Sequence, residues 1–135
     1  MSQTKSYLCL DVGEKRIGVA VADDGVCIAV PLETVSVDGT ELHRIAKLVI
    51  DESADAVVIG YPRNQSGEAT AQTAYVESFA KLLHDIAPRI VFQDESLTSV
   101  MAEQRLKSYG KPYEKGDIDA MAAAIILQDY MEQNL

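Results

Sequence analysis

An apolar stretch that ends in an acid and then turns back sharply constrains this fold more than any other feature. Residues 7–10 are apolar on both alternating faces, which is typical of a central strand covered above and below. Asp11 follows, Gly13 supplies a turn, and residues 17–22 resume an apolar strand. A carboxylate on a covered strand is unfavourable unless a cation or hydrogen-bond donors meet it. We therefore expect Asp11 to be the first member of an active site.

The order of the remaining apolar segments predicts an α/β fold. Strands are expected at 6–11, 16–23 and 26–30, with Pro31 interrupting the third strand and 34–37 continuing it at an edge. Short connections make these three an antiparallel meander. The chain then alternates: helix 39–53, strand 56–60, helix 70–86, strand 90–93, helix 98–108 and helix 117–133. This order predicts a mixed five-stranded sheet, three antiparallel strands followed by two parallel ones, with helices on both faces.

Helical spacing of apolar residues predicts which face of each helix is buried. In helix 39–53 the expected stripe is Leu42, Ile45, Ala46, Val49 and Ile50. In helix 70–86 it is Phe79, Leu82, Leu83 and Ile86. Eight consecutive apolar residues, 120–127, predict that the last helix lies largely buried against the sheet.

Length and composition set the class of protein. A chain of 135 residues with 47% apolar content is expected to form one globular domain, residues 1–135. No apolar run is long enough to span a membrane, and residues 1–6 carry no apolar signal core, so a cytoplasmic protein is expected. Cys9 and Cys27 are expected to be small apolar residues in a reducing compartment. A net charge of −9 argues against a non-specific nucleic-acid binder, so a polyanionic substrate would need local basic residues or metal ions.

Further acids stand at positions that the topology brings toward Asp11. Of Asp94 and Glu95, which follow a strand, only one can turn to the same face as Asp11. In the last helix, Asp119 shares the sheet-facing stripe, whereas Asp117 suits the helix N-terminus. Three converging carboxylates repel one another unless a hard divalent cation joins them. We therefore predict that Asp11, Glu95 and Asp119 are both the catalytic residues and the ligands of Mg²⁺ or Mn²⁺, with two-metal phosphodiester hydrolysis as the reaction.

Four motifs along nearly the whole chain resemble those of one known family. They are residues 11–18 (Asp-Val-Gly-Glu-Lys-Arg-Ile-Gly), 60–67 (Gly-Tyr-Pro-Arg-Asn-Gln-Ser-Gly), 94–99 (Asp-Glu-Ser-Leu-Thr-Ser) and 119–128. Together they are similar to those of the YqgF family, also called RuvX, of RNase H-like proteins. The resemblance implies an RNase H-like fold and a nuclease that matures the 5′ end of precursor 16S ribosomal RNA. It places the family's acids on the same Asp11, Glu95 and Asp119.

Candidate substrate contacts lie in or next to these motifs. They are Lys15, Arg16, Arg63, Asn64 and Thr98, as contacts to backbone phosphates. Lys15 and Arg16 also fit a solvated hairpin end, and Asn64 fits a turn as well as a phosphate contact. The position of Thr98 favours a helix N-cap. Ser96 stands where the family usually has arginine, which removes a phosphate contact. Glu14 stands where threonine is common, which adds negative charge near the site. Both departures are expected to lower substrate affinity.

Three other functions compete with an RNA nuclease. A Holliday junction resolvase would use the same chemistry on branched DNA. A non-catalytic RNA-binding accessory would keep the fold and cleave weakly. A nucleotide phosphatase of the actin type also opens on Asp-x-Gly, but it needs two such domains, which 135 residues cannot supply. The expected partner is therefore nucleic acid, either precursor 16S rRNA or branched DNA, with no membrane, and with the chain a monomer or weak homodimer.

Overall fold

The computed structural model describes residues 4–62, 70–95 and 98–135, and within them five strands form one sheet. The strands are β1 (Ser6–Val12), β2 (Arg16–Asp23), β3 (Val30–Ser36), β4 (Ala56–Pro62) and β5 (Ile90–Glu95). The helices are α1 (Glu41–Asp51), α2 (Ala71–Leu82), α3 (Thr98–Ser108) and α4 (Lys115–Asn134). The element order is the βββαβαβαα order predicted from the sequence.

The strand that carries Asp11 lies at the centre of this sheet. The spatial order is β3-β2-β1-β4-β5. β1 pairs antiparallel with β2 and parallel with β4, and β4 pairs parallel with β5. This confirms the mixed sheet with three antiparallel strands followed by two parallel ones. Because β1, β4 and β5 are parallel, their carboxyl ends meet at one edge, where ligand sites of open α/β sheets usually lie.

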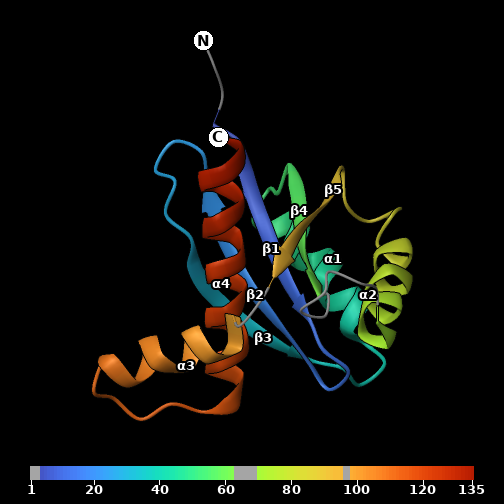
Figure 1. The fold of residues 1–135 in the computed structure, drawn as a ribbon. Helices are drawn as coiled ribbons and strands as arrows, with labels where there is room; N and C mark the ends of the chain where they lie inside the picture. The colour runs from blue at the N-terminus through green and yellow to red at the C-terminus, as the bar shows by residue number, and fades with distance from the viewer. Residues whose placement is uncertain (1–3, 63–69, 96–97) are drawn as a thin grey trace.

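Helices cover both faces of the sheet and create two separate cores. In Figure 1 the long α4 runs across one face, while α1 and α2 lie behind the other. Alternate residues of β1 divide between these cores: Leu8 and Leu10 join the α1 and α2 side, whereas Tyr7 and Cys9 join the α4 side. By the same alternation Asp11 belongs to the α4 face. The fully buried small residues of α4 let its backbone lie close to the sheet.

The third strand begins later than the sequence predicted. Residues 26–29 are not a strand, because the backbone carbonyl of Asp23 accepts from Cys27 N at 2.9 Å and its carboxylate accepts from Val26 N at 2.8 Å. Cys27 also has φ 60°, a left-handed backbone conformation that strands do not use. Pro31 lies inside β3 instead of interrupting it. This is tolerated because β3 is an edge strand and its register with β2 shifts beside Pro31.

Two predicted buried positions were wrong. Ile50 is 76% exposed and Leu82 is 59% exposed, whereas Leu48 and Val76 are buried in their helices. At about 100° per residue, Ile50 lies roughly 140° around α1 from the fully buried Ile45, so it points to solvent. Leu82 likewise lies to one side of the α2 stripe. The predicted stripes thus included one exposed residue in each helix and omitted the buried Leu48 and Val76, because apolar spacing alone does not show which part of a helix surface faces the sheet.

Smaller features of the fold also bear on the predictions. Both cysteines are free; Cys9 is buried and Cys27 is half-buried. Across the described ranges, no helix is both long enough and apolar enough to cross a membrane. The rings of Tyr7 and Tyr130 lie 5.9 Å apart between centroids, so the C-terminal half of α4 packs beside the start of β1.

Candidate active site

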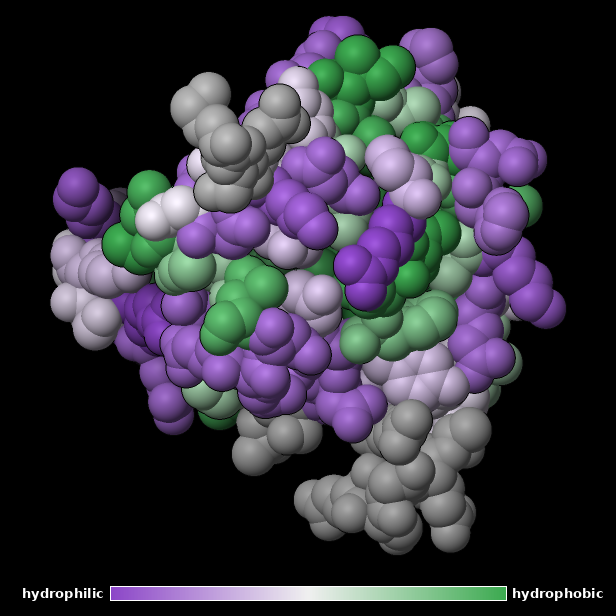
Figure 2. Space-filling view, turned by 90° about the horizontal axis from the view of Figure 1, so that it is seen from above, coloured by the Kyte–Doolittle hydropathy of each residue, from purple (hydrophilic) through white to green (hydrophobic). Residues whose placement is uncertain are grey.

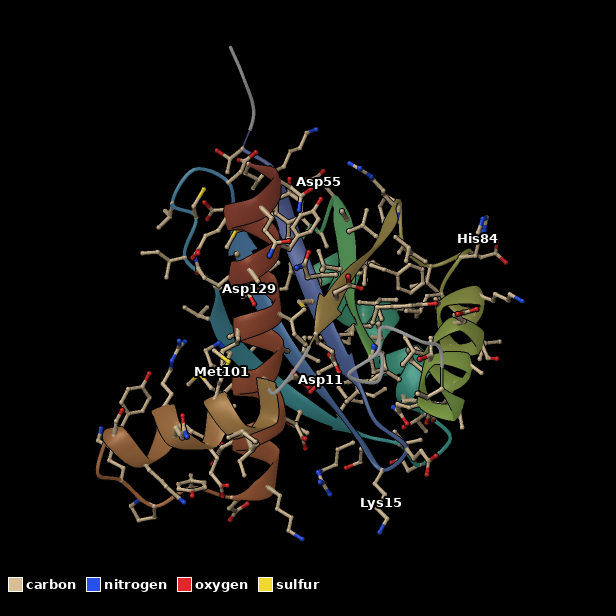
Figure 3. The ribbon with its side chains drawn as sticks, in the orientation of Figure 1. Asp11, Lys15, Asp55, His84, Met101 and Asp129 are labelled. Carbon is tan, nitrogen blue, oxygen red and sulfur yellow. The ribbon has the colours of Figure 1, made fainter. Side chains whose placement is uncertain are left out.

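Asp11 is half-buried near the end of the central strand. It lies opposite Gly18 of β2 in the sheet register, between the buried Leu10 and Val12. Figure 3 places it beside α4, with Lys15 pointing outward at the tip of the β1–β2 hairpin. The polar site therefore begins at the end of an apolar strand.

Glu95 reaches the same face from the end of β5. Strand alternation puts Val91 on the α4 side with Glu95, while Asp94 is exposed. Gly60 of β4 makes room for its carboxyl group: a Cβ at residue 60 would lie 2.2 Å from Glu95 Oε2 and 2.8 Å from Ile126 Cδ1. Any side chain at residue 60 would thus displace the Glu95 carboxyl group and the end of the Ile126 side chain.

Asp119 is brought to the site by a close backbone contact. A Cβ at Gly18 would lie 1.9 Å from the carbonyl oxygen of Asp119, so only glycine lets the first turns of α4 lie directly on β2. Since Gly18 pairs with Asp11, this contact places Asp119 next to Asp11. Asp117 points elsewhere: its carboxylate accepts from Glu114 N at 2.8 Å and caps the helix, as predicted.

Electrostatics tie the first two acids together. Burial, repulsion by Asp119 and an opposing hydrogen bond from Glu95 together raise the pKa of Asp11 to about 6. Burial, then the charge of Asp11 and the hydrogen bond to it, raise the pKa of Glu95 to about 8. Near neutral pH, Glu95 therefore keeps its proton and donates it to the Asp11 carboxylate.

A cation already contacts the third acid. Arg16 Nε donates to Asp119 Oδ2 at 2.6 Å, with the two side chains 39% and 24% exposed. Both residues line a hollow of about 430 Å³ together with Gly13, Glu14, Lys15 and Gln72. Two predicted substrate contacts, Lys15 and Arg16, thus lie beside the acids.

Gln72 is a member of this hollow that the sequence did not predict. Its side-chain amide donates to the backbone carbonyl of Val12 at 3.1 Å and links the start of α2 to the end of β1. No motif marks it, because it becomes relevant only through a contact across 60 residues of sequence.

The remaining predicted contacts lie in or beside parts of the chain that the structure does not describe. Arg63 and Asn64 are outside the described residues, as is Ser96. Thr98 is the first residue of α3, which agrees with the helix start predicted there. A larger hollow of about 720 Å³ lies between α2 and β5, and none of the three acids lines it.

The donor set fits a divalent cation in two respects. Glu95 Oε2 is buried without a hydrogen-bond partner, a costly state for a carboxyl oxygen unless a cation fills the place. The acids also supply only carboxylate oxygens, which suit hard divalent ions. Among the described residues, however, no three His, Cys, Asp or Glu side chains stand close enough together to hold an ion. Asp119 instead pairs with Arg16.

Comparison with known proteins places this chain in a family. The family model for RuvX, described as a Holliday junction resolvase, matches residues 5–133. The chain belongs to the RuvX family. A relative from Chloroflexus aurantiacus, named as a pre-16S rRNA nuclease, is 43% identical over 130 residues, which cover 93% of this chain and 85% of that protein. A relative of the same name from Crocosphaera subtropica is 41% identical over 133 residues, covering 95% and 93%.

Solved structures agree on the fold of this RuvX chain. T. thermophilus RuvC in complex with a Holliday junction substrate superposes with a TM-score of 0.57 at 17% identity, covering 96% of this chain and 94% of that one. At such low identity the match concerns the fold alone. It confirms the RNase H-like architecture that the four sequence motifs implied.

Proposed function

We propose that this RuvX chain is a divalent-metal-dependent endonuclease that matures the 5′ end of precursor 16S rRNA. The observation that carries the proposal is the buried, unpartnered Oε2 of Glu95 next to Asp11. A fold that buries two acids together and leaves one oxygen unsatisfied gains no stability from that arrangement. Such strain is typical of a functional site. The relatives' names supply the substrate class.

The three acids have distinct parts in this proposal. Asp11 interacts electrostatically with both other acids, so we assign it the ion that they would share. Glu95 has to lose its proton on metal binding, because metal-ligating carboxylates are ionised. Asp119 completes the set once its carboxylate is available. Mg²⁺ or Mn²⁺ held there would activate a water molecule and neutralise the charge that develops on the leaving oxygen.

Basic residues beside the acids would position the substrate. Lys15 and Arg16 line the hollow next to Asp119, where a backbone phosphate would be held against the negative field of the protein. The reaction is hydrolysis: water oxygen bonds to phosphorus, the bond to the 3′ oxygen breaks, and the products carry a 5′-phosphate and a 3′-hydroxyl.

Substitution of Asp11 tests the proposal. In Asp11→Asn, cleavage of a precursor 16S rRNA stem in Mg²⁺ or Mn²⁺ should fall below detection, because the amide cannot replace an anionic ligand. The fold should be retained, since asparagine matches the volume of aspartate. Asp85→Asn is the matched control, because that carboxylate is fully exposed and does not line the hollow beside Asp119. Wild-type cleavage by Asp11→Asn would refute the mechanism.

A second candidate is cleavage of branched DNA. It is favoured by the description of the family model and by the RuvC fold match. Assaying the precursor RNA stem and a four-way DNA junction in parallel, with the same two variants, separates the substrates. Cleavage of the junction alone would make the chain a resolvase. Metal binding without cleavage of either polymer would indicate a non-catalytic accessory.

A further inference from the structure

The ion pair between Arg16 and Asp119 is the starting observation. The two residues are 103 positions apart in sequence, yet Arg16 Nε and Asp119 Oδ2 are separated by only 2.6 Å. Arg16 opens β2 and Asp119 lies in the second turn of α4, where the Gly18 contact brings strand and helix together. The pairing is therefore imposed by the packing of α4 on β2, two residues away from Arg16.

Asp119 then has two competing uses for the same carboxylate. The proposed function requires it to join Asp11 and Glu95 around a cation. In the structure it faces a guanidinium instead, and no metal-sized group of three acids is formed among the described residues. Arg16 supplies a positive charge to Asp119, the acid whose negative charge repels that of Asp11. A guanidinium and a divalent ion repel each other, so each weakens the binding of the other to the Asp119 carboxylate.

The Arg16 guanidinium also has an alternative binding partner within reach, a substrate phosphate. Its side chain is 39% exposed and borders the hollow of about 430 Å³ that contains Lys15 and Gln72. A backbone phosphate in that hollow offers an anionic partner whose geometry suits a guanidinium. Moving Arg16 from Asp119 to phosphate would free the third acid without leaving the arginine unpaired.

We propose that Arg16 is a place-holder cation that occupies Asp119 until nucleic acid binds, so that metal and phosphate backbone bind with positive coupling. This inference rests on the proposed function, because it assumes that Asp119 is a metal ligand. Arg16 acts through Asp119 and is in this respect a positioning residue. Coupling of this kind is reciprocal: whatever draws Arg16 away strengthens metal binding, and metal binding strengthens the capture of phosphate by the same factor.

Calorimetric titration with Mn²⁺, without nucleic acid, tests the first half. Arg16→Gln should bind Mn²⁺ about three- to tenfold more tightly than wild type, as expected for loss of a partly exposed competing ion pair. Lys15→Gln removes a charge from the same hollow without touching that pair, and its affinity should change less than about twofold. Arg16→Lys keeps the charge and should fall between. Circular dichroism establishes that each variant is folded.

Binding of a fluorescent RNA hairpin, in Ca²⁺ and in EDTA, tests the second half. The dissociation constant in EDTA divided by that in Ca²⁺ should be about threefold larger for wild type than for Arg16→Gln, because only wild type has the coupling. General effects of Ca²⁺ on the RNA cancel when the two proteins are compared. The inference would be overturned if Arg16→Gln bound Mn²⁺ no more tightly than wild type, or if Lys15→Gln changed Mn²⁺ affinity as much as Arg16→Gln does. In either case, Mn²⁺ binding by wild type would still support the proposed function. Absence of Mn²⁺ binding in every variant would overturn both.

Discussion

At the scale of single residues, the site is defined by two acids that share one proton. The pKa of Asp11 is raised to about 6 and that of Glu95 to about 8, in both cases chiefly by burial. Glu95 Oε2 is also buried without a hydrogen-bond partner, so burial of this carboxyl group is unfavourable for a second reason. Burial of the two acids therefore costs folding free energy, which the proposed cation would offset.

The raised pKa values of Asp11 and Glu95 predict that the folded protein becomes less stable as pH rises. Groups whose pKa is raised on folding favour the folded state at low pH and lose that contribution as pH rises through the folded pKa. With EDTA present, the free energy of unfolding should fall by about 2–5 kcal/mol between pH 5 and pH 8.5. Urea titrations at the two pH values measure it. Glu95→Gln, which cannot ionise, should show a flatter profile, and a profile identical to wild type would contradict the assignment.

At the scale of elements, one glycine fixes how α4 lies on β2. Gly18→Ala should destabilise the protein by about 2–4 kcal/mol, because its Cβ would overlap the backbone of Asp119 and the helix would have to shift. Gly116→Ala, a substitution within α4 itself, is the matched control. Its Cβ would be 3.5 Å from Thr34, and helix propensity favours alanine, so stability should stay equal or rise by up to about 1 kcal/mol. Equal melting curves for both variants would contradict the close-contact argument.

Elements and their order were predictable from the sequence because periodicity and turn residues are local. The strand 16–23 and the helix 98–108 were predicted with their observed bounds. The start of the third strand was predicted too early, because the turn after Asp23 depends on that residue's carboxylate accepting a hydrogen bond from Val26 N. Helix faces were predicted only in part, since sequence spacing does not show which side of a helix the sheet covers.

The candidate site was predictable in part for a related reason. Carboxyl ends of parallel strands meet at one edge, so Asp11 and Glu95 could be brought together by topology alone. The pairing of Arg16 with Asp119 could not, because it depends on how deeply α4 sits on β2. Gln72 was missed for the same reason, since its contact with Val12 exists only in three dimensions.

At the scale of the whole molecule, the charge opposes the proposed substrate. The net charge is −9, and Figure 2 shows hydrophilic side chains interspersed with apolar patches on the face seen from above. Nucleic acid therefore has to be held by few local contacts. Lys15→Gln should weaken RNA binding similarly for all sequences and reduce the slope of log affinity against log salt by about 1. Fluorescence anisotropy over a salt series measures the slope, and an unchanged slope would remove Lys15 from the phosphate contacts.

The position of Asp119 in the last helix has a consequence for the order of synthesis. A ribosome makes Asp11 first, Glu95 much later and Asp119 after both, and Asp119 lies in α4, which packs over the Tyr7 and Cys9 face of the sheet. A nascent chain therefore holds only an incomplete set of acids above an open apolar surface. If Asp119 is the third metal ligand, as proposed, cleavage would therefore begin only after the helix that covers this apolar surface has been made.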